Sequence, residues 1–489
     1  MGEKLNRIIT SKFGDKLRAF YTSVWHVLVF GLICVFCHVF EMTILACVLF
    51  TILLVPAFIF CKNLLILVPF MTMCSFALTE NTNPETGYYN TPVRIATLIM
   101  LLVILLAALL FNLIYYKNIK LLFKKAYLTA SLCLATSALM LGGITEHTFT
   151  LMGVATAIAI GATMFLPYSV VVNCVDYEKE KTIKLFAWTL VVVSVIIGCA
   201  VLKSYYIHNF DTTSVHPKEY LKFGFAISNS AAAYVVIALP LTFYLVYKYK
   251  YGFLLMAVVA LEIFIIVMNY SRSSLVVALP GSVIVTIALM FKKKRGRLGY
   301  LITCGILIAA AVAIVVSMKD KAYDALFESF NGSSFDSGRF KIWWLGFERW
   351  QDSPVFGVGL WFLPSTGHDY TSFHCTPLTY LYCAGIVGLA AYIYHRYKTV
   401  RLVFSVKLTS ERVFLALSIF AMLLNALLDV AMTSAPHLIF YAIMLGYIEL
   451  DAKKTRADAI AAAEESAAAP EITESEQLPQ TEVNVSASE

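Results

Sequence analysis

The sequence predicts an all-α polytopic membrane protein, because its apolar runs are long and frequent and its charged residues are few. Of its 489 residues, 60% are hydrophobic and only 14% are charged, whereas soluble proteins carry about a quarter charged residues. Apolar runs near the ~20 residues that a helix needs to cross the hydrocarbon recur to about residue 450. These runs lack the alternating pattern of a membrane β-barrel.

The apolar runs predict about twelve to fourteen transmembrane helices. Those near residues 71 and 442 are short or weak. The expected spans centre on residues 30, 52, 71, 104, 136, 160, 193, 236, 261, 283, 308, 385, 421 and 442.

The distribution of basic residues predicts that both termini are cytoplasmic. Although the net charge is +7, most Lys and Arg fall in alternate short loops, as the positive-inside rule requires, so nucleic acid is not expected as a partner. These basic inside loops are expected around Lys62 and at 117–125, 178–184, 248–250, 292–297 and 396–412.

The remaining segments divide the chain into three parts. Residues 1–20 are charged, with apolar residues at helical spacing, and predict a cytoplasmic amphipathic helix rather than a cleavable signal peptide. Residues 21–450 form the expected transmembrane domain, and residues 451–489, rich in Ala, Glu and Ser, predict a disordered cytoplasmic tail. The 11 cysteines lie singly in apolar runs, without the spacing of a metal site or a disulfide framework.

Two expected external loops are long, residues 203–222 and residues 319–375. The second is far longer than ordinary connections and rich in aromatic residues, which indicates a functional segment rather than disorder. It contains SGRFKIWWLGFERWQDSPVFGVG at 337–359. Ser337 can cap a helix that Asp352-Ser353-Pro354 would end.

Aromatic side chains predict that this helix lies at the membrane surface. Phe340, Trp343, Trp344 and Phe347 fall on one face at helical spacing, and Trp350 follows. Trp is enriched among lipid headgroups, so a purely structural interpretation is an interfacial helix. Such a helix is also a suitable platform for a lipid-linked glycan.

Basic residues on the expected outer side need an explanation, because the positive-inside rule disfavours them. Lys222 ends the first long loop, Arg272 lies in a very short turn between apolar helices, and Arg339 begins the aromatic helix. A bound pyrophosphate would account for all three. His374, just before the next span, can accept a proton from a sugar hydroxyl, although a lone His near a span is more often a packed polar residue.

These segments resemble the O-antigen ligase/polymerase superfamily of bacterial membrane glycosyltransferases. The resemblance covers roughly residues 205–395, and its most specific part is the P-x-x-G-x-G turn with Gly357 and Gly359, spaced between Arg339 and His374. The other matching segments are KFGFAISNSAAAYVVIALPL (222–241), NYSRSSLVVALPG (269–281) and HCTPLTYLYCAGIVGL (374–389).

The resemblance implies transfer of a glycan from undecaprenyl pyrophosphate to the hydroxyl of a glycan, lipid or protein acceptor, on the outer face of the bacterial plasma membrane. It implies no metal and no other cofactor. His374 would be the base or would orient the acceptor, and Arg339 and Arg272 would hold the pyrophosphate. Lys222 stands where relatives often carry Arg, and it keeps the charge but loses the bidentate fork. Direct displacement would invert the anomeric configuration.

Two other functions stay open at this point. A flippase for lipid-linked oligosaccharides would suit the number of spans, but it should place charges around a central cavity and needs no long aromatic loop. A non-enzymatic scaffold would make His374 and the outer cations dispensable. Within the enzyme class, ligase and polymerase differ only in the acceptor, and the pattern of the peptidoglycan polymerases of cell shape and division is not found.

Overall fold

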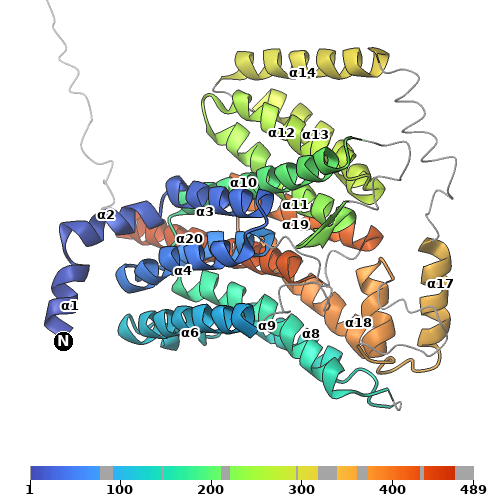
Figure 1. Cartoon of the computed structure of the whole chain (residues 1–489), viewed down its shortest axis with the longest axis horizontal. Helices are drawn as coiled ribbons and strands as arrows, with labels where there is room; N and C mark the ends of the chain where they lie inside the picture. Colours follow the sequence, from blue (N-terminus) through green and yellow to red (C-terminus); the bar gives the residue numbers. More distant parts are fainter. Residues whose placement is uncertain are drawn as a thin grey trace, which may run out of the picture.

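The computed structural model describes residues 2–77, 92–145, 148–210, 221–292, 296–317, 339–360, 373–429 and 434–468. In these residues the fold is almost entirely helical, and the one sheet is a two-stranded hairpin. Figure 1 shows most of the helices packed side by side in one bundle.

The described elements follow one another in chain order. They are α1 (Gly2–Ile9), α2 (Lys12–Tyr21), α3 (Val24–Val39), α4 (Thr43–Phe60), η1 (Leu64–Ile66), α5 (Leu67–Met73), η2 (Cys74–Ala77), α6 (Pro92–Tyr115), α7 (Asn118–Leu122), α8 (Thr129–Met140), α9 (Leu151–Cys174), α10 (Lys179–Ile207), β1 (Lys222–Phe223), β2 (Ala226–Ile227), α11 (Ser228–Lys248), η5 (Gly252–Leu255), α12 (Met256–Met268), α13 (Arg272–Lys292), α14 (Arg297–Ser317), α17 (Arg339–Trp350), α18 (Thr376–Val403), α19 (Ser410–Leu428) and α20 (Ala435–Ala468).

The structure confirms the predicted fold class. Every expected span centre, from residue 30 to residue 442, falls inside a helix. Among the described residues, 8 helices are long and apolar enough to cross a membrane, and up to 9 if α2 and α3, bent by 65°, count as one span. The other expected spans fall on α20 and on shorter apolar helices, which comprise 64–77, α8, 252–268 and 297–309.

The C-terminal boundary needs a correction. Residues 451–468 were expected to begin a disordered tail, but they continue α20 as far as Ala468. Their Ala, Lys and Glu residues have high helix propensity, and Asp451 at their start is fully buried. Residues 469–489 lie outside the described part of the chain.

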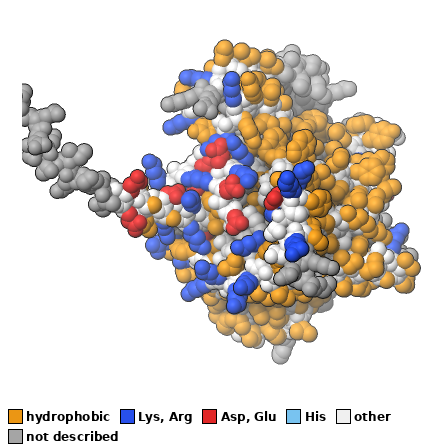
Figure 2. Space-filling view, turned by 90° about the vertical axis from the view of Figure 1, so that its left-hand side faces the viewer, with side chains coloured by type: hydrophobic (Ala, Val, Ile, Leu, Met, Phe, Trp, Pro, Cys, Tyr) orange, Lys and Arg blue, Asp and Glu red, His pale blue; other side chains and the backbone are white. Residues whose placement is uncertain are grey.

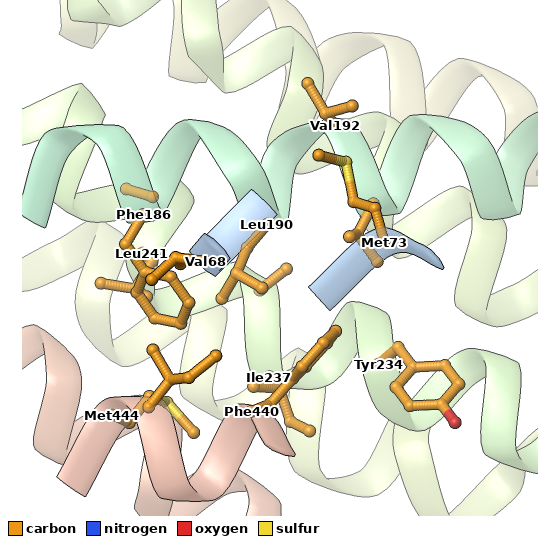
Figure 3. Packing of buried hydrophobic residues seen from close by; sticks show 14 of the residues in the cluster. Val68, Met73, Phe186, Leu190, Val192, Tyr234, Ile237, Leu241, Phe440 and Met444 are labelled. Atoms are coloured by element: carbon orange, nitrogen blue, oxygen red, sulfur yellow. The ribbon is translucent and has the colours of Figure 1, made fainter. Parts of the chain in front are cut away.

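The main hydrophobic core lies between α5, α10, α11 and α20. Figure 3 shows side chains from all four helices meeting there, among them Val68, Leu190, Ile237 and Phe440. α11 is the central helix, because 89% of its membrane-length window is buried inside the protein. In contrast, only 17% of the corresponding window of α6 is buried, so α6 presents most of its surface to lipid.

Ion pairs and helix directions define two ends of the bundle. At one end, Lys248 at the end of α11 pairs with Glu411 at 2.6 Å, and Arg412 pairs with Asp451 at 2.5 Å. This charged end, seen in Figure 2, carries clustered Lys, Arg, Asp and Glu side chains. α19 runs from it to the opposite end, where Asp429 follows the helix; that end is called the site end below.

The Asp451 carboxylate is the centre of the charged end. It also lies 3.3 Å from Lys179 and accepts hydrogen bonds from Tyr177 and Thr409. Its Arg412 partner is 0% exposed. The carboxylate therefore ties α10, α19 and α20 together in a buried network.

Replacing Asp451 with Ala should destabilise the protein strongly. Removal of one partner of a buried ion pair leaves an uncompensated charge, here on Arg412, and costs about 3–5 kcal/mol. Thermal unfolding in detergent measures the effect. Asp458→Ala on the same helix is the control, since Asp458 pairs with Lys454 at the surface; equal melting temperatures for the two variants would contradict the prediction.

Candidate functional site

Asp429 joins three segments that are distant in the sequence. Its Oδ1 lies 3.1 Å from Nδ1 of His374, before α18, and its Oδ2 lies 4.0 Å from the guanidinium of Arg339, the first residue of α17. Ser273, in the first turn of α13, donates a hydrogen bond to Oδ2 at 3.2 Å. The structure thus brings His374 and Arg339, both predicted site residues, to one carboxylate.

The surroundings favour a charged carboxylate at this position. Asp429 is only 5% exposed at its side chain, so it needs partners to offset the loss of water. It also follows the C-terminus of α19, where the helix dipole disfavours a negative charge. Arg339 and the N-terminal turn of α13 supply the compensating positive field.

The Asp429 contact orients the His374 ring. A carboxylate only accepts hydrogen bonds, so Nδ1 donates a proton to Asp429, and Nε2 is the ring nitrogen left for another partner. The His374 side chain is 30% exposed, so part of the ring is accessible to a ligand. Burial raises the pKa of the neighbouring Cys375 thiol, which keeps that thiol protonated and weakly nucleophilic.

The His374 backbone is held in an unusual conformation. Its φ is 48°, in the left-handed region that non-glycine residues rarely adopt. Strain of this kind persists where neighbouring contacts hold it and is concentrated at functional sites. Here Trp343 of α17 donates to the carbonyl of the preceding Phe373 at 2.8 Å, which fixes the chain as it enters His374.

The start of α13 is a compact polar turn. Ser271 donates to Ser274 at 2.9 Å, and Asn425 of α19 donates to the same Ser274 hydroxyl at 3.0 Å. Arg272 lies between these serines and directly precedes Ser273, the residue that bonds to Asp429. The turn therefore places the Arg272 backbone beside the Asp429 cluster.

The predicted P-x-x-G-x-G turn holds a break in α18. Gly385, inside α18, has φ 63° and ψ −158°. Backbone N–H groups bond across the break in both directions, from Val358 to Tyr382 and from Ile386 to Pro354, each at 2.9 Å. The turn thus satisfies backbone groups that the interrupted helix leaves unpaired.

Both glycines of this turn are required by its geometry. Gly357 and Gly359 have φ of 66° and 87°. A Cβ on Gly357 would lie 2.4 Å from the Tyr382 carbonyl oxygen, and one on Gly385 would lie 2.2 Å from that of Val355. The turn fixes the end of α17 against α18.

The aromatic residues of α17 point in two directions. Trp343 packs with Ile342 against a small core that contains Phe373, so it does not share the outer face as expected. The contact between Gly346 and Phe373 draws that face inward. Phe340, Trp344 and Phe347 are exposed, and Trp350 donates to the Pro354 carbonyl at 3.0 Å.

Lys222 lies apart from these contacts. It is exposed on β1 and pairs with Ile227 of β2, directly before α11. The hairpin packs through Phe225 against His38 and Phe76, near α3 and η2. Ser337, the predicted helix cap, lies outside the described residues.

Sequence reasoning missed Asp429. It is a single acidic residue in the apolar run NALLDVAM, and an ionisable residue in such a run is a functional candidate on its own. His437 was missed too: it is 0% exposed and stacks on Tyr234 with ring centroids 3.9 Å apart.

The described residues bring together no group of three His, Cys, Asp or Glu side chains that would hold a metal ion. Beside the Asp429 carboxylate the structure places the Arg339 guanidinium and the first turn of α13, which includes the Arg272 backbone. Such a site can bind an anion and can place one imidazole beside it.

Part of the chain is similar to a known protein family. Residues 255–393 match the family model described as O-antigen ligase. The chain contains an O-antigen ligase domain. This domain runs from the start of α12 into α18 and contains Arg272, Arg339, the glycine turn and His374, whereas Lys222 and Asp429 lie outside it. No curated protein matches the chain significantly.

The O-antigen ligase domain should depend on its glycine turn. Gly357→Ala places a methyl group against the Tyr382 carbonyl and strains a positive φ, so α17 should separate from α18. We expect a lower melting temperature in detergent and faster proteolysis within α17. Gly305→Ala on α14 is the control, since a Cβ there meets open space; an unaltered Gly357→Ala protein would show that the turn does not hold α17.

Proposed function

We propose that this protein transfers a glycan from a polyprenyl-pyrophosphate donor, such as undecaprenyl pyrophosphate, to an acceptor hydroxyl. The observation that carries the proposal is the Asp429 carboxylate, which holds a histidine and an arginine of an O-antigen ligase domain together. The acceptor is the end of a glycan chain, a lipid or a protein, so the enzyme is a ligase or a polymerase of surface polysaccharide.

The reaction follows from the placement of these groups. The acceptor oxygen attacks the anomeric carbon and forms the new glycosidic bond, while the bond from that carbon to the pyrophosphate oxygen breaks. The acceptor proton passes to Nε2 of His374, and Asp429 stabilises the imidazolium through Nδ1. Arg339 and Arg272 bind the departing pyrophosphate and stabilise its growing charge. A single displacement inverts the anomeric centre.

Arg339 is suited to hold a phosphate group. At 4.0 Å, its contact with Asp429 is an ion pair without a close hydrogen bond, so the planar fork has N–H donors for a phosphate. The side chain is 19% exposed, which leaves it accessible to a headgroup. On α17 the exposed Phe340, Trp344 and Phe347 offer aromatic surface beside it for sugar rings or headgroups.

The site end faces outward in this proposal. The charged end carries the basic residues around Lys62 and α7 and Lys248 at the end of α11, and the positive-inside rule puts such residues in the cytoplasm. His374 and Arg339 then lie on the external side of the bacterial plasma membrane, with the N-terminal helices α1 and α2 on the cytoplasmic side.

His374→Ala should lower kcat by about 10²- to 10⁴-fold, the usual contribution of a general base. Arg339→Ala should also lower kcat, because the pyrophosphate loses a fixed cation. The assay uses purified protein in lipid nanodiscs with a polyprenyl-pyrophosphate oligosaccharide and a glycan or lipid acceptor, and the anomeric configuration of the product is read by NMR.

Two controls make this assay decisive. His208→Ala removes an exposed His at the end of α10, and Lys203→Ala removes a cation that pairs with Glu41; both should stay close to wild type. Full transfer by His374→Ala and Arg339→Ala would disprove the catalytic assignment, and a retained anomer would disprove direct displacement. Translocation of the donor without transfer would favour a flippase.

Asp429→Asn should lower kcat strongly while the melting temperature changes little. The amide no longer compensates an imidazolium and can present an N–H to Nδ1, which favours the wrong tautomer; loss of an orienting Asp costs up to about 10⁴-fold in the Ser-His-Asp triad. We expect Asp429→Glu, which keeps the carboxylate, to retain more activity than Asp429→Asn. Equal activities of the two variants with equally lowered melting temperatures would show a purely structural role.

A further inference from the structure

A long apolar groove lies directly below the Asp429 cluster. It is formed by α11, α13 and α19 and has a volume of about 440 Å³. Its lining is apolar apart from Ser282. In a protein whose outer surface contacts lipid, such a groove takes hydrocarbon rather than water.

The upper end of the groove is continuous with the site. Leu427 and Leu428 line it and directly precede Asp429, and Val276 and Val277 line it two and three residues beyond Ser274. The same two helix ends carry the Asp429–Ser273 hydrogen bond. A ligand with its pyrophosphate at Arg272 and Arg339 would therefore have its hydrocarbon at the mouth of the groove.

Small residues give the groove its depth. Gly281, Ala278 and Ala421 line it, and a Cβ on Gly281 would have no heavy atom within 4 Å. From Val276 to Val285 the groove follows α13 for about 13 Å at the ~1.5 Å rise per residue of a helix. This length suits the first few isoprene units of a polyprenyl chain rather than the whole chain.

The groove opens sideways toward the membrane. Val276, Ile284 and Phe420 line it and are 59%, 67% and 58% exposed. A chain can enter from the bilayer without crossing a polar barrier. By contrast, the larger cavity of about 680 Å³ between α12, α13 and α14 begins at Leu279 on α13, farther from Arg272, so it lacks this continuity with the site.

We propose that the α11–α13–α19 groove binds the pyrophosphate-proximal isoprene units of the lipid donor and so sets the enzyme's preference for long polyprenyl chains. The inference rests on the proposed function, because it takes the donor to be a polyprenyl pyrophosphate. A polyprenyl chain leaves lipid rather than water when it enters the groove, so close packing is the only source of favourable binding free energy. The preference is correspondingly modest.

Gly281→Leu tests the groove by filling it. The new side chain grows into open space, which preserves the fold, and occupies the volume of the proposed isoprene units. We measure KM in nanodiscs for two donors with the same glycan pyrophosphate, one on a long polyprenyl chain and one on a two-isoprene chain. The ratio of the long-chain KM to the short-chain KM should rise by about three- to tenfold. A tenfold rise corresponds to a loss of ~1.4 kcal/mol of binding free energy.

Gly305→Leu is the matched control, because its Cβ position on α14 is also open and it does not line the groove. This variant should keep the wild-type KM ratio. If Gly281→Leu and Gly305→Leu have the same ratio while both transfer glycan, the groove does not bind the donor chain, although the proposed function stands.

A binding measurement separates the two proposals. A polyprenyl diphosphate with a photoreactive group on its first isoprene units should label α11, α13 or α19 in the wild type, and excess polyprenyl diphosphate should prevent the labelling. Labelling prevented equally well by phospholipid would show that bulk lipid fills the groove and would overturn the inference. Specific labelling without transfer to any acceptor would support the groove and contradict the proposed function.

Discussion

The Asp429 carboxylate is the contact on which the arrangement of the site depends. It is buried at the C-terminal end of α19, where the helix dipole already opposes a negative charge. The segments that approach it each supply positive charge or a donor, in Arg339, His374 and Ser273. Because the buried carboxylate needs these partners, the starts of α13, α17 and α18 lie together around it.

A second constraint fixes the distance between α17 and α18. The broken helix at Gly385 exposes backbone groups, and the turn between Pro354 and Gly359 pairs with them. Trp343 adds a bond to the carbonyl of Phe373. These contacts hold the chain on both sides of His374, so its left-handed backbone is set by the packing of two helices rather than by its own preference.

The sequence predicted the helices well, because long apolar runs have few alternatives in a membrane. It also singled out His374 and Arg339 as polar residues on the expected outer side, and the structure brings both to Asp429. It did not predict Asp429 as their partner, since a contact between α19 and α18 depends on tertiary packing rather than on local pattern. For the same reason, the inward direction of Trp343 followed from its contact with Phe373 and not from helical spacing.

The helical extent of α20 was harder to predict for a compositional reason. A segment rich in Ala, Glu and Lys suits both a solvated helix and a disordered tail, and the burial of Asp451 against Arg412 favours the helix. For both Asp429 and Asp451, the sequence did not predict the contacts that the carboxylate makes. Acidic residues at the ends of apolar helices carry contacts that periodicity alone does not reveal.

The position of Asp429 has a consequence for the modular use of this domain. The O-antigen ligase match ends at residue 393, inside α18, but the carboxylate that orients His374 comes from the end of the following helix. The boundary of the family match and the boundary of the proposed site are therefore different. A chimera that exchanged only residues 255–393 between two such proteins would pair the histidine of one parent with the carboxylate of the other, and the exchange would have to include α19 to move the site as a unit.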